Sequence, residues 1–200
     1  MSSVKSVVIS CAGIGSRLGL GLTKALVQIN GRSLISWQLE LFKDVEDIRI
    51  VIGFQANDII EEVRKQCGRD FIIDVRISGD EYSDGGLTLN DMIYVSKQLE
   101  KATVDFIHVS GGNTIKKGSS MPASGTAPAP HKHASEEIKK HVSIPVATVS
   151  RINEPWVADE LIANGVCDAC MIGRPNLCDS EFANKAFEGK VDDIRPCIGC

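Results

Sequence analysis

The sequence has few aromatic residues, no long apolar run and no excess of positive charge. Aromatic side chains make up 5% of the 200 residues, too few for a platform on which nucleic-acid bases could stack. The formal net charge of −4 provides no basic field that would attract a phosphate backbone. These shortages predict a protein that has no nucleic-acid partner.

The apolar runs are also short. VVISCA and IPVATV have the length of single strands, whereas a membrane-spanning helix needs about 20 apolar residues. The first residues show no charged and apolar leader. We therefore expect a cytoplasmic protein without a membrane partner. The seven cysteines are an odd number for a compartment that keeps thiols reduced, which favours metal ligands or isolated thiols over disulfides.

Short apolar runs alternate with amphipathic stretches along the chain. Strands are predicted at 4–10, 48–54, 71–77, 105–110, 144–150 and 168–173. Helices are predicted at 33–43, 56–66, 89–102 with Thr88 as cap, 135–142, 153–165, and from a cap at Asp179 to Gly189. Six strand–helix units predict an α/β fold with parallel strands, as an open sheet or a barrel.

One long segment, 111–133, has no regular pattern and is rich in Gly, Ser, Ala and Pro. It is either a lid over an active site or a surface loop.

Three arginines, Arg76, Arg151 and Arg174, lie at or just past the carboxyl ends of predicted strands. In a parallel sheet or barrel these ends share one rim, which is where such folds bind ligands. Gly173 precedes Arg174 and would let the backbone approach a ligand closely, and a helix is expected to begin a few residues on. The guanidinium groups and nearby amides suit a phosphate.

The motifs VRISGDE, HVSGG, SRIN, GRP and CIGC follow one another between Gly68 and Cys200. In this order they resemble the second half of the flavin-dependent barrel of the old yellow enzyme family, in the branch of 2,4-dienoyl-CoA reductase and related NADH:flavin oxidoreductases. The resemblance implies half of a (β/α)8 TIM barrel, with FMN as cofactor, NAD(P)H as reductant and a small-molecule substrate. It places Arg76 at the flavin ring and Ser150 among the residues that bind the cofactor. It places Arg151, Gly173 and Arg174 at the phosphate of FMN.

The same resemblance makes Cys197 and Cys200 two of the four ligands of a [4Fe–4S] cluster, with the other two cysteines outside this sequence. Cys167 and Cys170 have the same spacing but flank a predicted strand, so we interpret Cys170 as a small apolar core residue. A dithiol without a cluster, or a cluster shared between two chains, are the alternatives.

The residues that would donate protons are not evident. The resemblance expects a histidine after HVSGG, where Asn113 and Thr114 stand. His131 and His133 would replace it or would be solvated loop residues. The catalytic residues are therefore unknown at this stage.

Residues 4–65 resemble a different family, the sugar-nucleotide and related nucleotidyltransferases. Gly13, Gly15 and Arg17 follow the first strand and would wrap nucleotide phosphates, while Lys24 would neutralise a departing pyrophosphate. Thr23 stands where that family usually has proline. Its metal-binding aspartate has no counterpart here, because Asp80 belongs to a flavin-barrel motif.

The sequence thus predicts two fragments joined near 61–68. Residues 1–66 form a nucleotidyltransferase-like βαβα fragment of two Rossmann-like units, and residues 67–200 form a C-terminal half barrel. Open edges must be covered. Either the two N-terminal units extend the parallel sheet to six strands, or a homodimer completes the barrel. Three functions stay open: an FMN-binding oxidoreductase whose turnover is uncertain, an NTP-binding module, and a non-catalytic chimera.

Overall fold

A computed structural model divides the chain into two compact units, Met1–Ile72 and Ile73–Cys200. It describes residues 6–11, 19, 21–45, 47–53, 55–113, 120–123 and 125–199. The sequence placed the boundary between the two family-like fragments at residues 66 and 67, and this boundary stays a prediction. Among the described residues, no helix combines the length and the apolar character needed to cross a bilayer.

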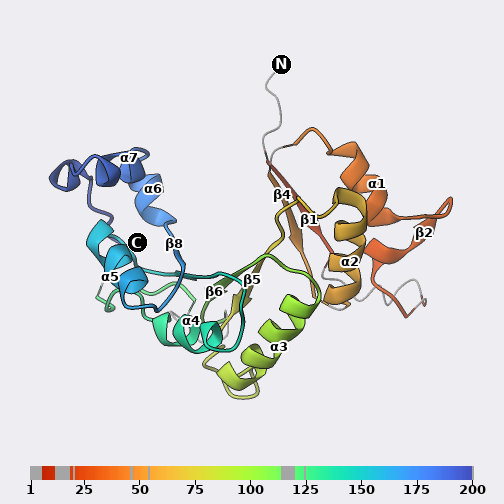
Figure 1. Cartoon of the computed structure of the whole chain (residues 1–200), viewed down its shortest axis with the longest axis horizontal. Helices are drawn as coiled ribbons and strands as arrows, with labels where there is room; N and C mark the ends of the chain where they lie inside the picture. Colours follow the sequence, from red (N-terminus) through yellow and green to blue (C-terminus); the bar gives the residue numbers. More distant parts are fainter. Residues whose placement is uncertain are drawn as a thin grey trace. The chain divides into compact units, whose positions relative to one another are not determined.

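The first unit contains one parallel strand pair with two helices (Figure 1). Its strands are β1 (Ser6–Ser10) and β4 (Asp47–Val51), and its helices are α1 (Leu34–Leu41) and α2 (Ala56–Cys67), which pack against each other. Glu62 of α2 accepts hydrogen bonds from the hydroxyl groups of Ser33 and Ser36 at the start of α1. These bonds tie the two helices together at a partly buried position.

A hairpin interrupts this unit and corrects the prediction that all strands are parallel. The two-residue strands β2 (Gln28–Ile29) and β3 (Arg32–Ser33) pair antiparallel. Asn30 and Gly31 form the turn with φ of 51° and 78°, and positive φ at both central residues is what a tight hairpin turn requires. The Asn-Gly pair was the signal for this hairpin.

The second unit is built on a four-stranded, fully parallel sheet in the order β5-β6-β7-β8. The strands are β5 (Asp74–Ser78), β6 (Phe106–Ser110), β7 (Val146–Val149) and β8 (Ala169–Met171). The helical segments are α3 (Leu89–Lys101), α4 (Lys132–Lys139), α5 (Pro155–Ala163), α6 (Arg174–Cys178), α7 (Phe182–Phe187) and the short 3-10 helix η3 (Val191–Asp193). The predicted α/β fold with parallel sheets is confirmed.

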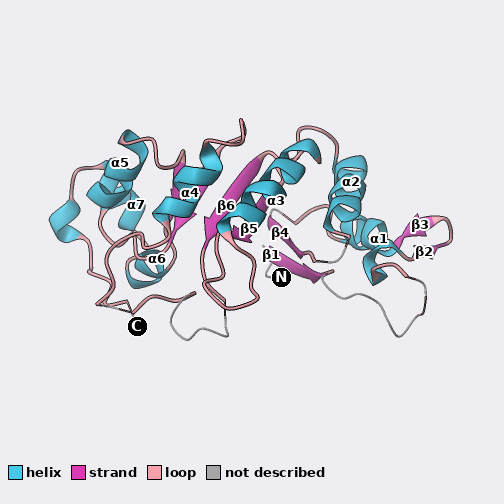
Figure 2. Cartoon of the chain, turned by 90° about the horizontal axis from the view of Figure 1, so that it is seen from below, coloured by secondary structure: helices cyan, strands magenta, loops and turns pink. Residues whose placement is uncertain are grey.

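The two faces of this sheet differ. Val75, Ile77, Ile107 and Val109 share one face and are buried, and α3, α4 and α5 pack along the strands (Figures 1 and 2). Because side chains alternate along a strand, the intervening residues lie on the opposite face. Arg76, which pairs with His108 in the register of β5 and β6, is exposed there. The chemistry-bearing side chains of the strands therefore lie away from the helix-covered core.

The ends of two helices follow from specific side chains. Thr88 and Asp91 form a capping box at the start of α3, as the predicted cap required. Asp179 is not the N-cap of α7, a position that Glu181 occupies. Asp179 instead accepts bonds from the backbone N–H groups of Arg195 and Glu181 and from Lys185 Nζ, and these bonds lower the pKa of its carboxyl group to about 2. It fixes the C-terminal segment to α7 from outside the helix.

Candidate functional site

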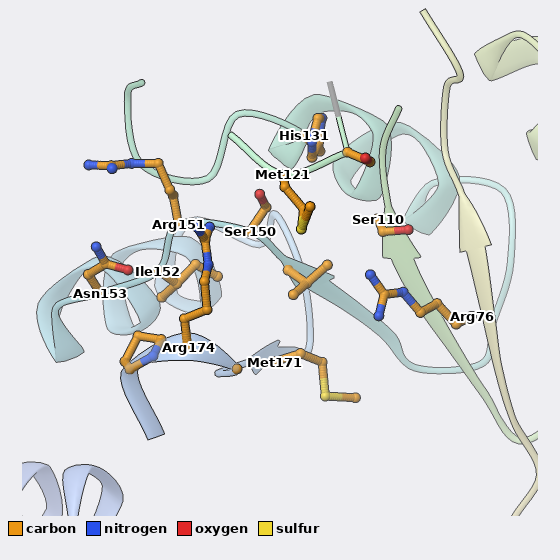
Figure 3. Close-up of a pocket in the computed structure, with 14 residues that line it drawn as sticks. Arg76, Ser110, Met121, His131, Ser150, Arg151, Ile152, Asn153, Met171 and Arg174 are labelled. Carbon is orange, nitrogen blue, oxygen red and sulfur yellow. The ribbon is translucent and has the colours of Figure 1, made fainter. Parts of the chain in front are cut away.

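A pocket of about 230 Å³ lies in the second unit, at the ends of its strands (Figure 3). All five residues that the sequence predicted for cofactor binding line it: Arg76, Ser150, Arg151, Gly173 and Arg174. They come from β5 and from the segments that follow β7 and β8, up to about 100 residues apart along the chain. The sheet therefore brings the predicted residues together, although their roles stay predictions.

Two positions within this set differ from expectation. Arg76 lies in the middle of β5, because that strand begins at Asp74 instead of residue 71. Helix α6 begins at Arg174 itself and not a few residues later. A Cβ atom at Gly173 would meet no chain atom within 4 Å. The packing of the described chain therefore does not require glycine at this position, and the close approach of its backbone to a ligand stays a prediction.

The backbone beside the pocket is strained. Ser150 and Arg151, immediately after β7, have φ of 100° and 48°, a region that residues with a Cβ adopt at a cost of about 1–3 kcal/mol. Tyr82 and Ala129, which lie near the pocket residue His131 in space or in sequence, also have positive φ, at 52° and 46°. Strain of this kind collects at sites whose side chains must point in one direction.

Backbone carbonyls hold the guanidinium groups of two pocket arginines, Arg151 and Arg174. Arg174 donates from Nη1 to the Gly199 carbonyl at 2.9 Å and from Nη2 to the Pro122 carbonyl at 3.4 Å. Arg151 donates from Nη1 to the Ala123 carbonyl at 3.1 Å. The two guanidinium groups thus donate to uncharged carbonyl oxygens. A negatively charged oxygen, such as that of a phosphate, would be a stronger acceptor for them.

The described part of the irregular segment lies against this pocket. Ser120 and Met121 line it, and the carbonyls of Pro122 and Ala123 accept the arginine bonds described above. The Met121 side chain is 75% exposed. Residues 120–123 thus lie beside the pocket, and both the lid and the surface loop stay predictions for residues 111–133.

His108 lies beside Arg76 across the β5–β6 pair. Burial, and then the positive charge of Arg76, lower the pKa of His108 to about 4. Its Nε2 atom is buried and has no hydrogen-bond partner among the described residues. A neutral imidazole next to a guanidinium leaves the positive charge of this face on Arg76.

Sequence analysis named His131 and His133 as replacements for a proton-donating histidine or as solvated loop residues, but it missed Tyr82, whose hydroxyl lies near both. His131 is 4% exposed and lines the pocket. The Tyr82 hydroxyl lies 3.2 Å from its Nδ1 and 3.4 Å from Nε2 of His133. The signal that was available is the sequence HKH at the start of an amphipathic helix, together with Gly111 in HVSGG, whose missing side chain leaves room for the His131 ring.

The predicted nucleotide loop is only partly described. Gly13, Gly15 and Arg17 lie outside the described residues. Lys24 is exposed at the start of the 3-10 helix η2 (Lys24–Leu26). Thr23 is fully buried, its hydroxyl donates to the Cys11 carbonyl at 3.0 Å, and its N–H donates to Gln55 Oε1 at 2.7 Å.

The cysteines that the structure describes do not form a metal site. Cys200 lies outside the described residues, and the Cys197 carbonyl accepts a bond from Asn153. Cys167 and Cys170 have their sulfur atoms 3.7 Å apart and pack with the apolar core of this unit. Within the described ranges, no three His, Cys, Asp or Glu side chains are grouped to hold a metal ion. The thiols that the structure describes therefore do not fit an iron–sulfur cluster.

Two family models match the chain. Residues 54–193 match the NADH:flavin oxidoreductase / NADH oxidase family, and residues 7–89 match the MobA-like NTP transferase domain. These two matches confirm the two resemblances seen in the sequence, and they overlap at residues 54–89.

Individual relatives agree with the longer match. The NADH oxidase of Thermoanaerobacter brockii is 38% identical over 143 residues, which are 72% of this chain and 22% of that protein. The bilirubin reductase of Mediterraneibacter gnavus is 34% identical over 170 residues, which are 84% of this chain and 26% of that protein. The solved structure of 2-naphthoyl-CoA reductase with 2-naphthoyl-CoA superimposes with a TM-score of 0.68 at 27% identity, covering 72% of this chain and 22% of that one.

The chain thus spans 22% to 26% of the length of these curated relatives, and the flavin-family match extends over more than half of the chain itself. Together with the parallel sheet and the arginine-lined pocket, this match shows that the chain belongs to the NADH:flavin oxidoreductase / NADH oxidase family.

Proposed function

We propose that the second unit binds FMN in its pocket and is the cofactor-binding half of a flavin-dependent reductase for a small molecule, with NAD(P)H as the source of electrons. The observation that carries this proposal is the convergence on one pocket of five predicted cofactor residues, from β5 and from the segments that follow β7 and β8. The family match supports the identity of the cofactor.

In this proposal the phosphate lies between Arg151 and Arg174. Both guanidinium groups already donate to carbonyl oxygens, and a phosphate dianion would replace these acceptors with charge-assisted, bidentate ones. Ser150 and Arg151, whose backbone has positive φ, both line the pocket. The donor set therefore fits a phosphate group.

Arg76 lies on the sheet at another part of the pocket wall (Figure 3). FMN supplies the hydride chemistry when it is bound. The part that the chain contributes is electrostatic, since a guanidinium fixed on a strand would stabilise negative charge on a reduced ring. The lowered pKa of His108 leaves Arg76 as the cation of this strand pair.

The four parallel strands correspond in this proposal to half of a barrel. The sheet face that bears Asp74, Arg76 and His108 carries ionisable side chains, and the face and its edges need a cover. We propose that a second copy of the chain supplies this cover and completes the barrel. Size-exclusion chromatography with light scattering tests this point, because a monomer at all concentrations would contradict it.

The proposed cofactor is tested by absorption spectroscopy. Purified protein is mixed with FMN, passed over a desalting column and recorded in the visible range. We expect a flavin spectrum that elutes with the protein. A colourless protein fraction after this treatment would contradict the proposal.

A second candidate function is an NTP-binding module in the first unit. The match of residues 7–89 to an NTP transferase domain favours it, and Lys24 is exposed beside the segment that would wrap the phosphates. A nucleotide titration monitored by calorimetry tests it. Heat of binding that disappears on Lys24→Ala would support this function.

A further inference from the structure

Tyr82 connects a buried histidine at the pocket wall with an exposed one. Its hydroxyl lies 3.2 Å from Nδ1 of His131 and 3.4 Å from Nε2 of His133. The Tyr82 and His131 rings are stacked, with centroids 5.5 Å apart. His131 is 4% exposed and lines the pocket, while His133 is exposed. The three side chains therefore span the distance from solvent to the pocket.

The surrounding backbone fixes this arrangement. Tyr82 adopts a left-handed conformation with φ of 52°, and its N–H donates to Asp80 Oδ1 at 2.6 Å. A Cβ atom at Gly111 would lie 2.4 Å from Nδ1 of His131, so the glycine of HVSGG is what allows the ring to pack there. The left-handed backbone at Tyr82 and the close packing at Gly111 both fix the stacked arrangement of the Tyr82 and His131 rings.

The chemistry of the three groups suits the movement of a proton. Burial, and then the negative charge of Asp80, raise the pKa of Tyr82, so the phenol stays protonated at neutral pH. A hydroxyl group donates one hydrogen bond while it accepts others. Its proton can pass to Nδ1 of His131 while Nε2–H of His133 replaces it. The distances exceed the usual range for O–H donors, but contacts of this kind often shorten when substrate binds.

We propose that His133, Tyr82 and His131 form a proton relay that supplies the pocket during reduction of an electron-poor alkene, an inference that rests on the proposed FMN-dependent function. Bound FMN in its reduced form would supply a hydride to one carbon of the alkene, and the neighbouring carbon would take a proton. The proton leaves His131, which lines the pocket and is the catalytic residue. His131 regains it through the Tyr82 hydroxyl from His133, which exchanges with solvent. Tyr82 is a positioning residue that acts through His131.

The test separates proton delivery from electron transfer. FMN-loaded protein is reduced with dithionite without oxygen and then mixed with either 2-cyclohexenone or ferricyanide. The first acceptor takes a hydride and a proton, and the second takes only electrons. Tyr82→Phe keeps the ring and removes the hydroxyl, and Tyr94→Phe on α3, where the side chain is 66% exposed, is the matched control.

For Tyr82→Phe we expect reoxidation by 2-cyclohexenone to slow by about 10- to 100-fold, because general acids contribute about 100-fold or more. Reoxidation by ferricyanide and FMN absorbance should be unchanged, and Tyr94→Phe should match the wild type with both acceptors. His133→Gln, at an exposed position, should slow the alkene reaction in the same selective way. This second variant guards against a folding defect in the first.

Three results would overturn the relay while leaving the FMN proposal intact. These are an unchanged alkene rate in Tyr82→Phe, equal losses with both acceptors in both variants, and FMN-loaded wild-type protein that reduces ferricyanide but not the alkene. Loss of the flavin spectrum in the wild type is seen before any kinetic step, and it would instead contradict the proposed function itself.

Discussion

The two units differ in how far the sequence determines their sites. In the second unit, predicted ligand residues from β5 and from the segments that follow β7 and β8 line one pocket. In the first unit, the predicted ligands belong to one loop and the lysine that follows it, and three of the four lie outside the described residues. A parallel sheet turns distant sequence positions into neighbours at one edge, whereas the arrangement of a single loop depends on its own backbone.

The largest effect should separate the two proposed ligands. We expect Arg174→Ala to weaken FMN binding by about 100-fold, which corresponds to the roughly 2–3 kcal/mol of charge-assisted hydrogen bonds. Lys24→Ala should leave FMN affinity unchanged and weaken nucleotide binding, which Arg174→Ala should not affect. Fluorescence and calorimetric titrations of both variants check this crossover. Equal FMN affinity in Arg174→Ala and wild type would contradict it.

A second substitution tests the packing between helix α4 and the buried face of the sheet. A Cβ atom at Gly79 would lie 2.6 Å from Ala134 Cβ and 2.8 Å from Val109 Cγ1, neither of which has a flexible end. We expect Gly79→Ala to lower the free energy of unfolding by about 1–3 kcal/mol. Gly125→Ala, where no atom lies within 4 Å, should change it by less than about 0.5 kcal/mol. Urea unfolding followed by circular dichroism compares the two.

The third substitution restores the proline that nucleotidyltransferases usually have before the lysine. The φ of Thr23 is −63°, which suits proline. Thr23→Pro nevertheless removes the N–H that donates to Gln55 Oε1 and the hydroxyl that donates to the Cys11 carbonyl. We therefore expect the free energy of unfolding of the first unit to fall by about 1–2 kcal/mol. Thr23→Val keeps the N–H and should lose less.

The two tryptophans allow this effect to be assigned to one unit. Trp37 belongs to the first unit and Trp156 to the second. In a Trp156→Phe background, the fluorescence of Trp37 reports urea unfolding of the first unit alone. A Thr23→Pro variant as stable as the wild type would show that these hydrogen bonds do not hold the segment.

The smallest effect concerns pH. The pKa of His108 in the folded chain is about 4, below its ordinary value of 6.5. The unfolded chain therefore binds more protons between pH 6.5 and 4, and the contribution of His108 to stability, present above pH 6.5, is lost as the pH falls through this window. Because solvent reaches part of the His108 ring and screens its charge, we expect the free energy of unfolding to fall by only about 1 kcal/mol as the pH drops from 6.5 to 4.

NMR titration of His108 measures this pKa directly. Arg76→Gln removes the second cause of the shift and should raise the pKa, though not to 6.5, because burial is the larger cause. A His108 pKa near 6.5 in the unmodified chain would contradict this description of the sheet face.

The sequence anticipated the parts of the structure that depend on periodicity and on strand order. The six predicted strands and most helices appear within a few residues of their predicted positions. Thr88 was recognised because its side chain acts on the next turn of its own helix. The five pocket residues were found because each lies in or beside a strand of one parallel sheet.

The rest depends on contacts between distant residues. Asp179 was predicted to cap a helix, but its oxygens bind Lys185 and the N–H of Arg195, 16 residues away. Neither partner could be inferred from local spacing. The same holds for Tyr82 and His131, which are 49 residues apart and meet because Gly111 leaves room for a ring.

The central claim is that Arg151 and Arg174 hold the phosphate of FMN in the pocket of the second unit. Parallel titrations of the protein with FMN and with riboflavin, which lacks the phosphate, test it most directly. We expect FMN to bind about 100-fold more tightly, since the phosphate contributes charge-assisted bonds that riboflavin cannot form. Equal affinities for the two flavins, or no binding of either, would contradict the claim.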